Sequence, residues 1–117
     1  MKVAIIILAD TENYEGLARV VNALEAAKEF KEAGDEIRII FDGAASKWPV
    51  ELSKDDHPYR ALYESVQDKV AGVCGYCANA FQVRDANEAC GVNFIEEFEG
   101  HPSFRSLLRE GFQVLTF

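Results

Sequence analysis

The sequence opens with a run of aliphatic, mostly β-branched residues, KVAIIILAD, over residues 2–10. A strand is apolar at every position only when both of its faces are buried, and parallel sheets contain such strands. The run is far shorter than the roughly 20 residues that cross a bilayer. The polar residues that follow it are also unlike the cleavage site of a signal peptide. We therefore predict a core strand, and we expect it to be the central strand of its sheet because it is so uniformly apolar.

Strand patterns alternate with helix patterns along the rest of the chain. Further strands are predicted at EIRIIFDG (36–43), KVAGVCG (69–75), GVNFI (91–95) and FQVLTF (112–117). Helices are predicted over 17–30, from Pro58 through Val66, over 78–89 and from Pro102 through Glu110, and the irregular segment 44–56 has room for a helical turn. This order predicts an α/β fold with a five-stranded parallel sheet that is covered on both faces. At this chain length we expect one domain over residues 1–117.

The charge balance excludes some classes of partner. The formal net charge is -8, from 12 basic and 20 acidic side chains. Proteins that bind phosphate backbones need a basic face, so we predict no nucleic-acid partner and no membrane partner. The odd number of cysteines, three, favours a reducing compartment, and we expect a cytoplasmic protein. Neither glycine-rich nucleotide-binding motif occurs, and we predict no cofactor.

The chemistry is expected at the carboxyl ends of the strands, where open α/β sheets bind their ligands. The stretch GVCGYCANAF, residues 72–81, crosses one such end. Cys74 ends the predicted third strand, so we expect it to be buried and to act as a structural or resolving thiol. Cys77 falls at or just before the first turn of the next helix, where free N–H groups and the helix dipole stabilise a thiolate. We therefore predict that Cys77 is the nucleophile.

Other interpretations of the cysteines stay open. Cysteine is among the most buried residue types, so these residues can also be core fillers, Cys74 and Cys90 more readily than Cys77. Cys74 and Cys77 have the spacing of half a zinc site, which Cys90, His57 or His101 would have to complete. No second paired motif occurs, and we predict no metal; both histidines are assigned to surface helix starts. A reversible disulfide between Cys74 and Cys77 would make the pair a thiol-disulfide switch.

A non-catalytic binding module is a further alternative. Its pocket would lie between subunits, lined by Asp10, Asn13 and the backbone of Gly75 and Tyr76. The competing role for Asp10 and Asn13 is helix capping, for which both residue types are favourable. Asp42 and the glycine after it are predicted to form a turn.

The chain resembles the DsrE/DsrF-like family, which includes the sulfur-relay subunits of the TusD type. The resemblance lies in FDGAA at the end of the second strand, in GVCGYCANAFQVRD and in the closing EGFQVLTF. It implies a three-layer α/β/α fold of the flavodoxin-like class, and a trimer or hexamer with cysteines near the subunit contacts. It also implies a persulfide on the cysteine that starts the helix after the third strand, by position Cys77. We thus expect a persulfide carrier or sulfurtransferase-like protein of intracellular sulfur relay, with sulfur donor and acceptor proteins as partners.

Overall fold

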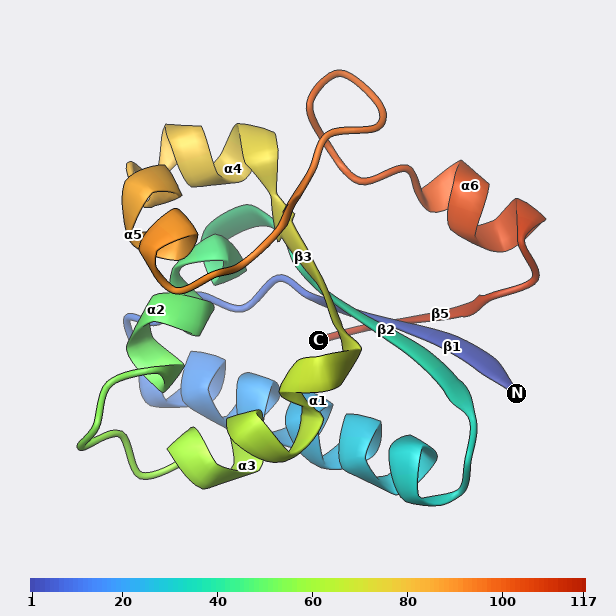
Figure 1. Cartoon of the computed structure of the whole chain (residues 1–117), viewed down its shortest axis with the longest axis horizontal. Coiled ribbons are helices and arrows are strands. Elements are labelled where there is room, and N and C mark those ends of the chain that lie inside the picture. Colours follow the sequence, from blue (N-terminus) through green and yellow to red (C-terminus); the bar gives the residue numbers. More distant parts are fainter.

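The computed structural model describes residues 1–117 and contains one five-stranded sheet. The strands are β1 (Lys2–Ile7), β2 (Glu36–Phe41), β3 (Val70–Cys74), β4 (Phe94–Ile95) and β5 (Gln113–Thr116). All neighbours pair in parallel, in the order β4-β3-β2-β1-β5 (Figure 1). The predicted α/β class and the five-stranded parallel sheet are confirmed.

The middle strand is β2, so the expectation that the first strand is central was wrong. β1 lies one place away, between β2 and β5. The inner half of β2, residues 39–41, is as deeply buried as β1. A uniformly apolar run identifies a strand as internal, but it cannot show which of two internal strands is the middle one.

Helices connect all the strands. They are α1 (Tyr14–Glu32), η1 (Gly43–Lys47, a 3₁₀-helix), α2 (Trp48–Leu52), α3 (Arg60–Val66), η2 (Gln67–Lys69, also 3₁₀), α4 (Gly75–Ala80), α5 (Arg84–Ala89) and α6 (Phe104–Arg109). α1 begins where the Asn13 side chain accepts a hydrogen bond of 2.8 Å from the N–H of Gly16. It stops before Gly34, whose φ of 82° suits glycine. None of the helices has the length and apolar character needed to span a bilayer.

The helix predicted over 78–89 is two helices, α4 and α5, and this prediction was wrong in detail. α4 starts earlier, at Gly75, and ends where Gln82 takes a left-handed φ of 57°. The N–H of Val83 then donates to the carbonyl of Ala78 at 2.8 Å, which is the bonding of a helix C-cap. No glycine marks this break in the sequence. The predicted strand over 91–95 likewise shortens to the two residues of β4.

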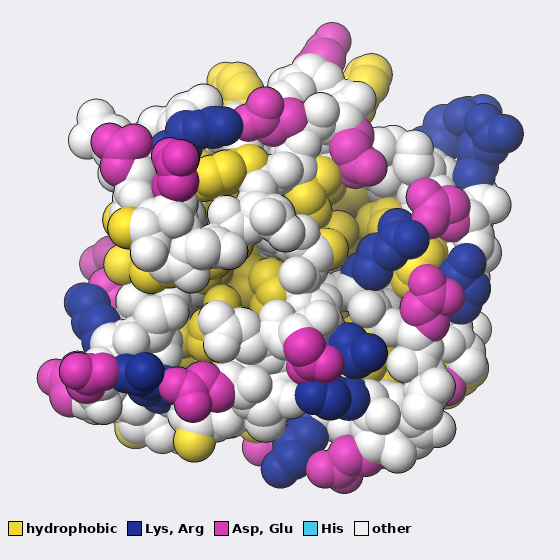
Figure 2. All heavy atoms as spheres, viewed as in Figure 1, with side chains coloured by type: hydrophobic (Ala, Val, Ile, Leu, Met, Phe, Trp, Pro, Cys, Tyr) yellow, Lys and Arg dark blue, Asp and Glu magenta, His cyan; other side chains and the backbone are white.

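Apolar side chains cover both faces of the sheet. Val3, Ile5 and Ile7 of β1 belong to the larger core, which also contains buried residues of α1 and α3. Ala4 and Ile6 point the other way, into a smaller core with residues of the α6 region. This alternation explains the uninterrupted apolar run, because a strand between two cores has no face left for water. Acidic and basic side chains are interspersed over the face drawn in Figure 2.

Candidate functional site at the cysteine pair

Cys74 and Cys77 stand at the junction of β3 and α4 and differ in burial. Cys74 is the last residue of β3 and is fully buried. Cys77 lies in the first turn of α4 and keeps 9% of its surface exposed. A Cβ at position 75 would lie 2.2 Å from Oε1 of Glu96, so a larger residue there would have to displace the Glu96 side chain. The strand-to-helix junction thus positions two thiols at the carboxyl edge of the sheet, with Cys77 nearer the surface.

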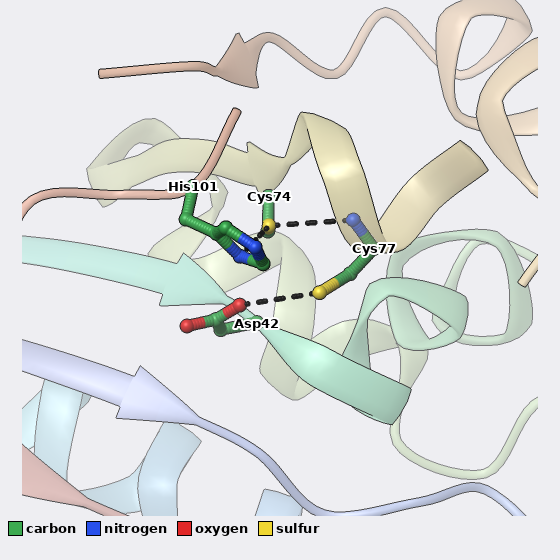
Figure 3. A group of neighbouring side chains, drawn as sticks. All are labelled: Asp42, Cys74, Cys77 and His101. Atoms are coloured by element: carbon green, nitrogen blue, oxygen red, sulfur yellow. Dashed lines mark hydrogen bonds between the residues drawn. The ribbon is translucent and has the colours of Figure 1, made fainter. Parts of the chain in front are cut away.

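Hydrogen bonds hold the two sulfurs in different surroundings. The N–H of Cys77 donates to Sγ of Cys74 at 3.4 Å, and the Cys74 thiol donates to the carbonyl of Gly100 at 3.8 Å. The Cys77 thiol donates to Oδ1 of Asp42 at 3.5 Å (Figure 3). Burial raises the pKa of the Cys74 thiol to about 12. Cys74 therefore stays protonated at neutral pH.

His101 and Asp42 approach the sulfurs from distant parts of the chain. Nδ1 of His101 lies 3.3 Å from Sγ of Cys74. The His101 ring packs on the ring of Tyr76, with centroids 4.5 Å apart, and the backbone N–H of His101 donates to the carbonyl of Phe98 at 2.8 Å. One ligand atom from each of Asp42, Cys74, Cys77 and His101 lies within 4.8 Å of all the others (Figure 3). The site is therefore a cluster of four reactive groups.

Sequence reasoning gave two members of this cluster other roles. Asp42 does make the predicted turn, since its Oδ1 accepts from the N–H of Gly43 at 2.8 Å, but the same oxygen also reaches Cys77. The signal was its position directly after β2, because the parallel strands β2 and β3 end at the same edge of the sheet. His101, assigned to a surface helix start, is half-buried against Cys74. No local pattern predicts this contact, because the loop after β4 folds back to make it.

Comparison with known proteins places the chain in a family. The sequence model of the DsrE/DsrF-like family matches residues 1–117. The chain belongs to the DsrE/DsrF-like family. The uncharacterized protein MJ0733 of Methanocaldococcus jannaschii is 33% identical to this DsrE-like chain, over 98% of the chain and 94% of the relative. The resemblance inferred from the sequence motifs is thereby confirmed.

A solved structure supports the fold of the DsrE-like chain. It is the conserved protein of unknown function BT1422 from Bacteroides thetaiotaomicron, with a TM-score of 0.65 and 18% sequence identity. The match covers 97% of this chain and 94% of that one. At this identity the likeness shows a shared α/β architecture only.

The remaining cysteine and histidine of the DsrE-like chain lie outside the cluster. Cys90 caps the end of α5 and lines a small hollow of about 60 Å³ with Tyr63. His57 packs edge-on against Trp48, with ring centroids 6.3 Å apart. Of the three residues considered as partners for the cysteine pair, the fold therefore brings only His101 to it.

The residues predicted to line a pocket lie in two places in the isolated chain. Asn13 lines a hollow of about 470 Å³ beside α1, together with Trp48 and residues near them. Asp10 binds the Lys47 ammonium at 2.6 Å, which holds the pKa of that carboxyl below its usual value. Gly75 and Tyr76 stand instead at the cysteine cluster. A pocket shared by all four between subunits stays a prediction.

Proposed function

We propose that Cys77 carries sulfur as a persulfide in a sulfur relay. The observation that carries this proposal is the position of Cys77, which lies beyond the carboxyl end of β3 and keeps 9% of its surface exposed, whereas Cys74 is fully buried. Ligands and chemistry gather at this edge of parallel sheets. Membership of the DsrE/DsrF-like family, which suggests sulfur relay, supports the same role.

Sulfur transfer at Cys77 is an exchange between a thiol and a persulfide, with no net oxidation. The Cys77 thiolate attacks the outer sulfur of a donor persulfide, R–S–SH, and the S–S bond of the donor breaks. The donor leaves as the thiol R–SH, taking up the proton that Cys77 gave up. Oδ1 of Asp42, 3.5 Å from Sγ of Cys77, is placed to accept this proton in between. An acceptor thiolate then attacks the outer sulfur of the Cys77 persulfide and restores the thiol.

A thiol-disulfide switch is the second candidate function. The observation that favours it is that the free Cys74 and Cys77 sulfurs lie within 4.8 Å of each other. The Cys74 thiol can attack the inner sulfur of a Cys77 persulfide, which releases hydrogen sulfide and leaves a Cys74–Cys77 disulfide. An external dithiol must then reduce this bond by exchange. Cys74 would thus act as the resolving thiol.

Intact mass spectrometry after incubation with a small-molecule persulfide tests both proposals. We expect the wild-type chain and Cys90→Ser to gain the mass of one sulfur atom and Cys77→Ser to gain none. In Cys74→Ser the persulfide should last longer, because no thiol resolves it. A sulfur adduct that persists in Cys77→Ser and vanishes in Cys74→Ser would overturn the assignment. A wild-type chain that takes up no sulfur would favour the binding module, with the hollow at Asn13 as its pocket.

We also propose that the chain forms the trimer or hexamer that the family resemblance implies, with the cysteines near the subunit contacts. Three apolar side chains from α4, its C-cap and the loop before His101 support this, since Tyr76, Phe81 and Phe98 keep 57%, 41% and 65% of their surfaces exposed. Light scattering of the purified chain should give a multiple of the 13.0 kDa monomer mass. A monomeric mass at all concentrations would contradict the proposal.

Three free cysteines suit a reducing compartment such as the cytoplasm.

A further inference from the structure

Four side chains that each offer one metal ligand meet at the carboxyl edge of the sheet. Asp42 comes from the end of β2, Cys74 and Cys77 come from the β3–α4 junction, and His101 comes from the loop before α6. We propose that these four residues bind a zinc ion. Two thiolates, one imidazole and one carboxylate are ligand types that zinc takes, and four is its usual number.

The distances between the ligand atoms fit a tetrahedral site. Bonds of about 2.3 Å to sulfur and about 2.0 Å to nitrogen or oxygen place neighbouring ligand atoms about 3.3 to 3.8 Å apart. Sγ of Cys74 lies 3.3 Å from Nδ1 of His101, and Sγ of Cys77 lies 3.5 Å from Oδ1 of Asp42. Because all pairs are within 4.8 Å, shifts of at most about 1.5 Å bring the remaining pairs to the same spacing.

The charges that the ligands take in the metal-bound form also suit a divalent cation. None of the hydrogen bonds or ion pairs of the four residues involves a lysine or arginine. With both thiols ionised, Asp42, Cys74 and Cys77 carry three negative charges in one half-buried group, and one divalent ion reduces this to a single charge. Binding releases the two thiol protons, and Nδ1 of His101 binds the ion through its lone pair. The ion thus supplies the countercharge that the protein itself does not.

Contacts around the cluster already restrain the ligands. The Tyr76 ring packs on the His101 imidazole, and the N–H of Gly43 holds Oδ1 of Asp42 at 2.8 Å. Such outer contacts orient ligands and strengthen metal binding. All four positions are filled by protein atoms, which is the pattern of a structural zinc site. The ion would tie together the end of β2, the β3–α4 junction and the loop before α6.

This inference goes beyond the sulfur-relay proposal and does not depend on it. A bound ion occupies both sulfurs, so the zinc-loaded chain could form neither the Cys77 persulfide nor the Cys74–Cys77 disulfide. Zinc and sulfur therefore compete for the same thiols, and metal would hold the chain in a form that does not carry sulfur.

Cobalt titration of the reduced, metal-free full-length chain under anaerobic conditions tests the site. We expect one Co²⁺ per chain, a thiolate-to-cobalt charge-transfer band and the intense visible bands of tetrahedral cobalt, all abolished when Zn²⁺ displaces the cobalt. His101→Ala and Asp42→Ala should weaken binding by about 100-fold or more, because losing only an outer partner of a ligand already costs roughly 10- to 100-fold. Cys90→Ser and His57→Ala are matched controls outside the cluster and should bind as the wild type does.

The zinc proposal would be overturned if the wild type showed no charge-transfer band. It would also be overturned if His101→Ala kept the wild-type affinity for cobalt, or if Cys90→Ser lost it. Circular dichroism establishes that each variant is folded. If His101→Ala does not fold, His101→Gln and Asp42→Asn, which keep the side-chain volume, decide the question by the same criteria. Sulfur uptake by the metal-free wild type and Cys90→Ser is measured in parallel, so a failure of the zinc proposal is distinguishable from a failure of the sulfur proposal.

Discussion

Replacing Asn87 with alanine should destabilise the fold by about 1 to 3 kcal/mol, because it removes the buried hydrogen bond that ties α5 to η1. Asn87 is fully buried, and its Nδ2 donates to the carbonyls of Ser46 and Val83, both at 2.9 Å. The first bond joins η1, which follows Asp42, to α5, and the second stays within the first turn of α5. Alanine leaves the Ser46 carbonyl without this donor, and a buried group that loses its partner costs about 1 to 3 kcal/mol. The Val83 carbonyl keeps the backbone N–H of residue 87, and the lost Oδ1 of Asn87 had no partner, so neither adds to the cost.

Ser46→Ala is the matched substitution and should have the opposite sign. The Ser46 hydroxyl is buried without a hydrogen-bond partner, so its removal should leave the stability unchanged or raise it by up to about 1 kcal/mol. Urea unfolding followed by the fluorescence of Trp48, the single tryptophan, gives the free energy of unfolding of each variant. If Ser46→Ala destabilises the chain as much as Asn87→Ala does, the reasoning from unsatisfied buried groups is refuted.

Substitutions at three further positions test other parts of the structure. Burial raises the pKa of Tyr63 from 10.0 to about 12. The wild type should therefore lose up to about 3 kcal/mol of stability as the pH rises from 10 to about 12, because the unfolded chain gives up this proton first. Below pH 10 this contribution to the stability stays constant. Tyr63→Phe should lose correspondingly less in urea unfolding at alkaline pH, and equal losses in both chains would count against burial as the cause. Asn13→Ala should lower the free energy of unfolding by about 1 kcal/mol through loss of the α1 cap, whereas Asn13→Ser should keep most of the capping stabilisation. Equal melting temperatures for the two variants would contradict the capping role. Gly100→Ala should cost about 1 to 2 kcal/mol, because Gly100 has a φ of 83°, and an unchanged urea midpoint would argue against strain there.

The sequence predicts the features of this fold that depend on neighbouring residues. The apolar run 2–10 indicates a strand between two cores, and the junction between Cys74 and Cys77 follows from the local change of pattern. The break at Gln82 escapes prediction because a residue other than glycine takes the left-handed conformation. The approach of His101 to Cys74 escapes it for another reason. It joins positions 27 residues apart through a loop whose path depends on the whole sheet.

Phe117 is hydrogen-bonded to the end of β1, which determines where a purification tag can be attached. The N–H of Phe117 donates to the carbonyl of Ile6 at 2.9 Å, and the N–H of Leu8 donates to the carbonyl of Phe117 at 2.7 Å. A tag joined after Phe117 would leave from the same edge of the sheet as the cysteines, about 14 Å across three strand spacings. Six added imidazoles there could capture cobalt and imitate a site. A tag placed before Met1 leaves from the opposite edge, and it should be removed before any metal is added.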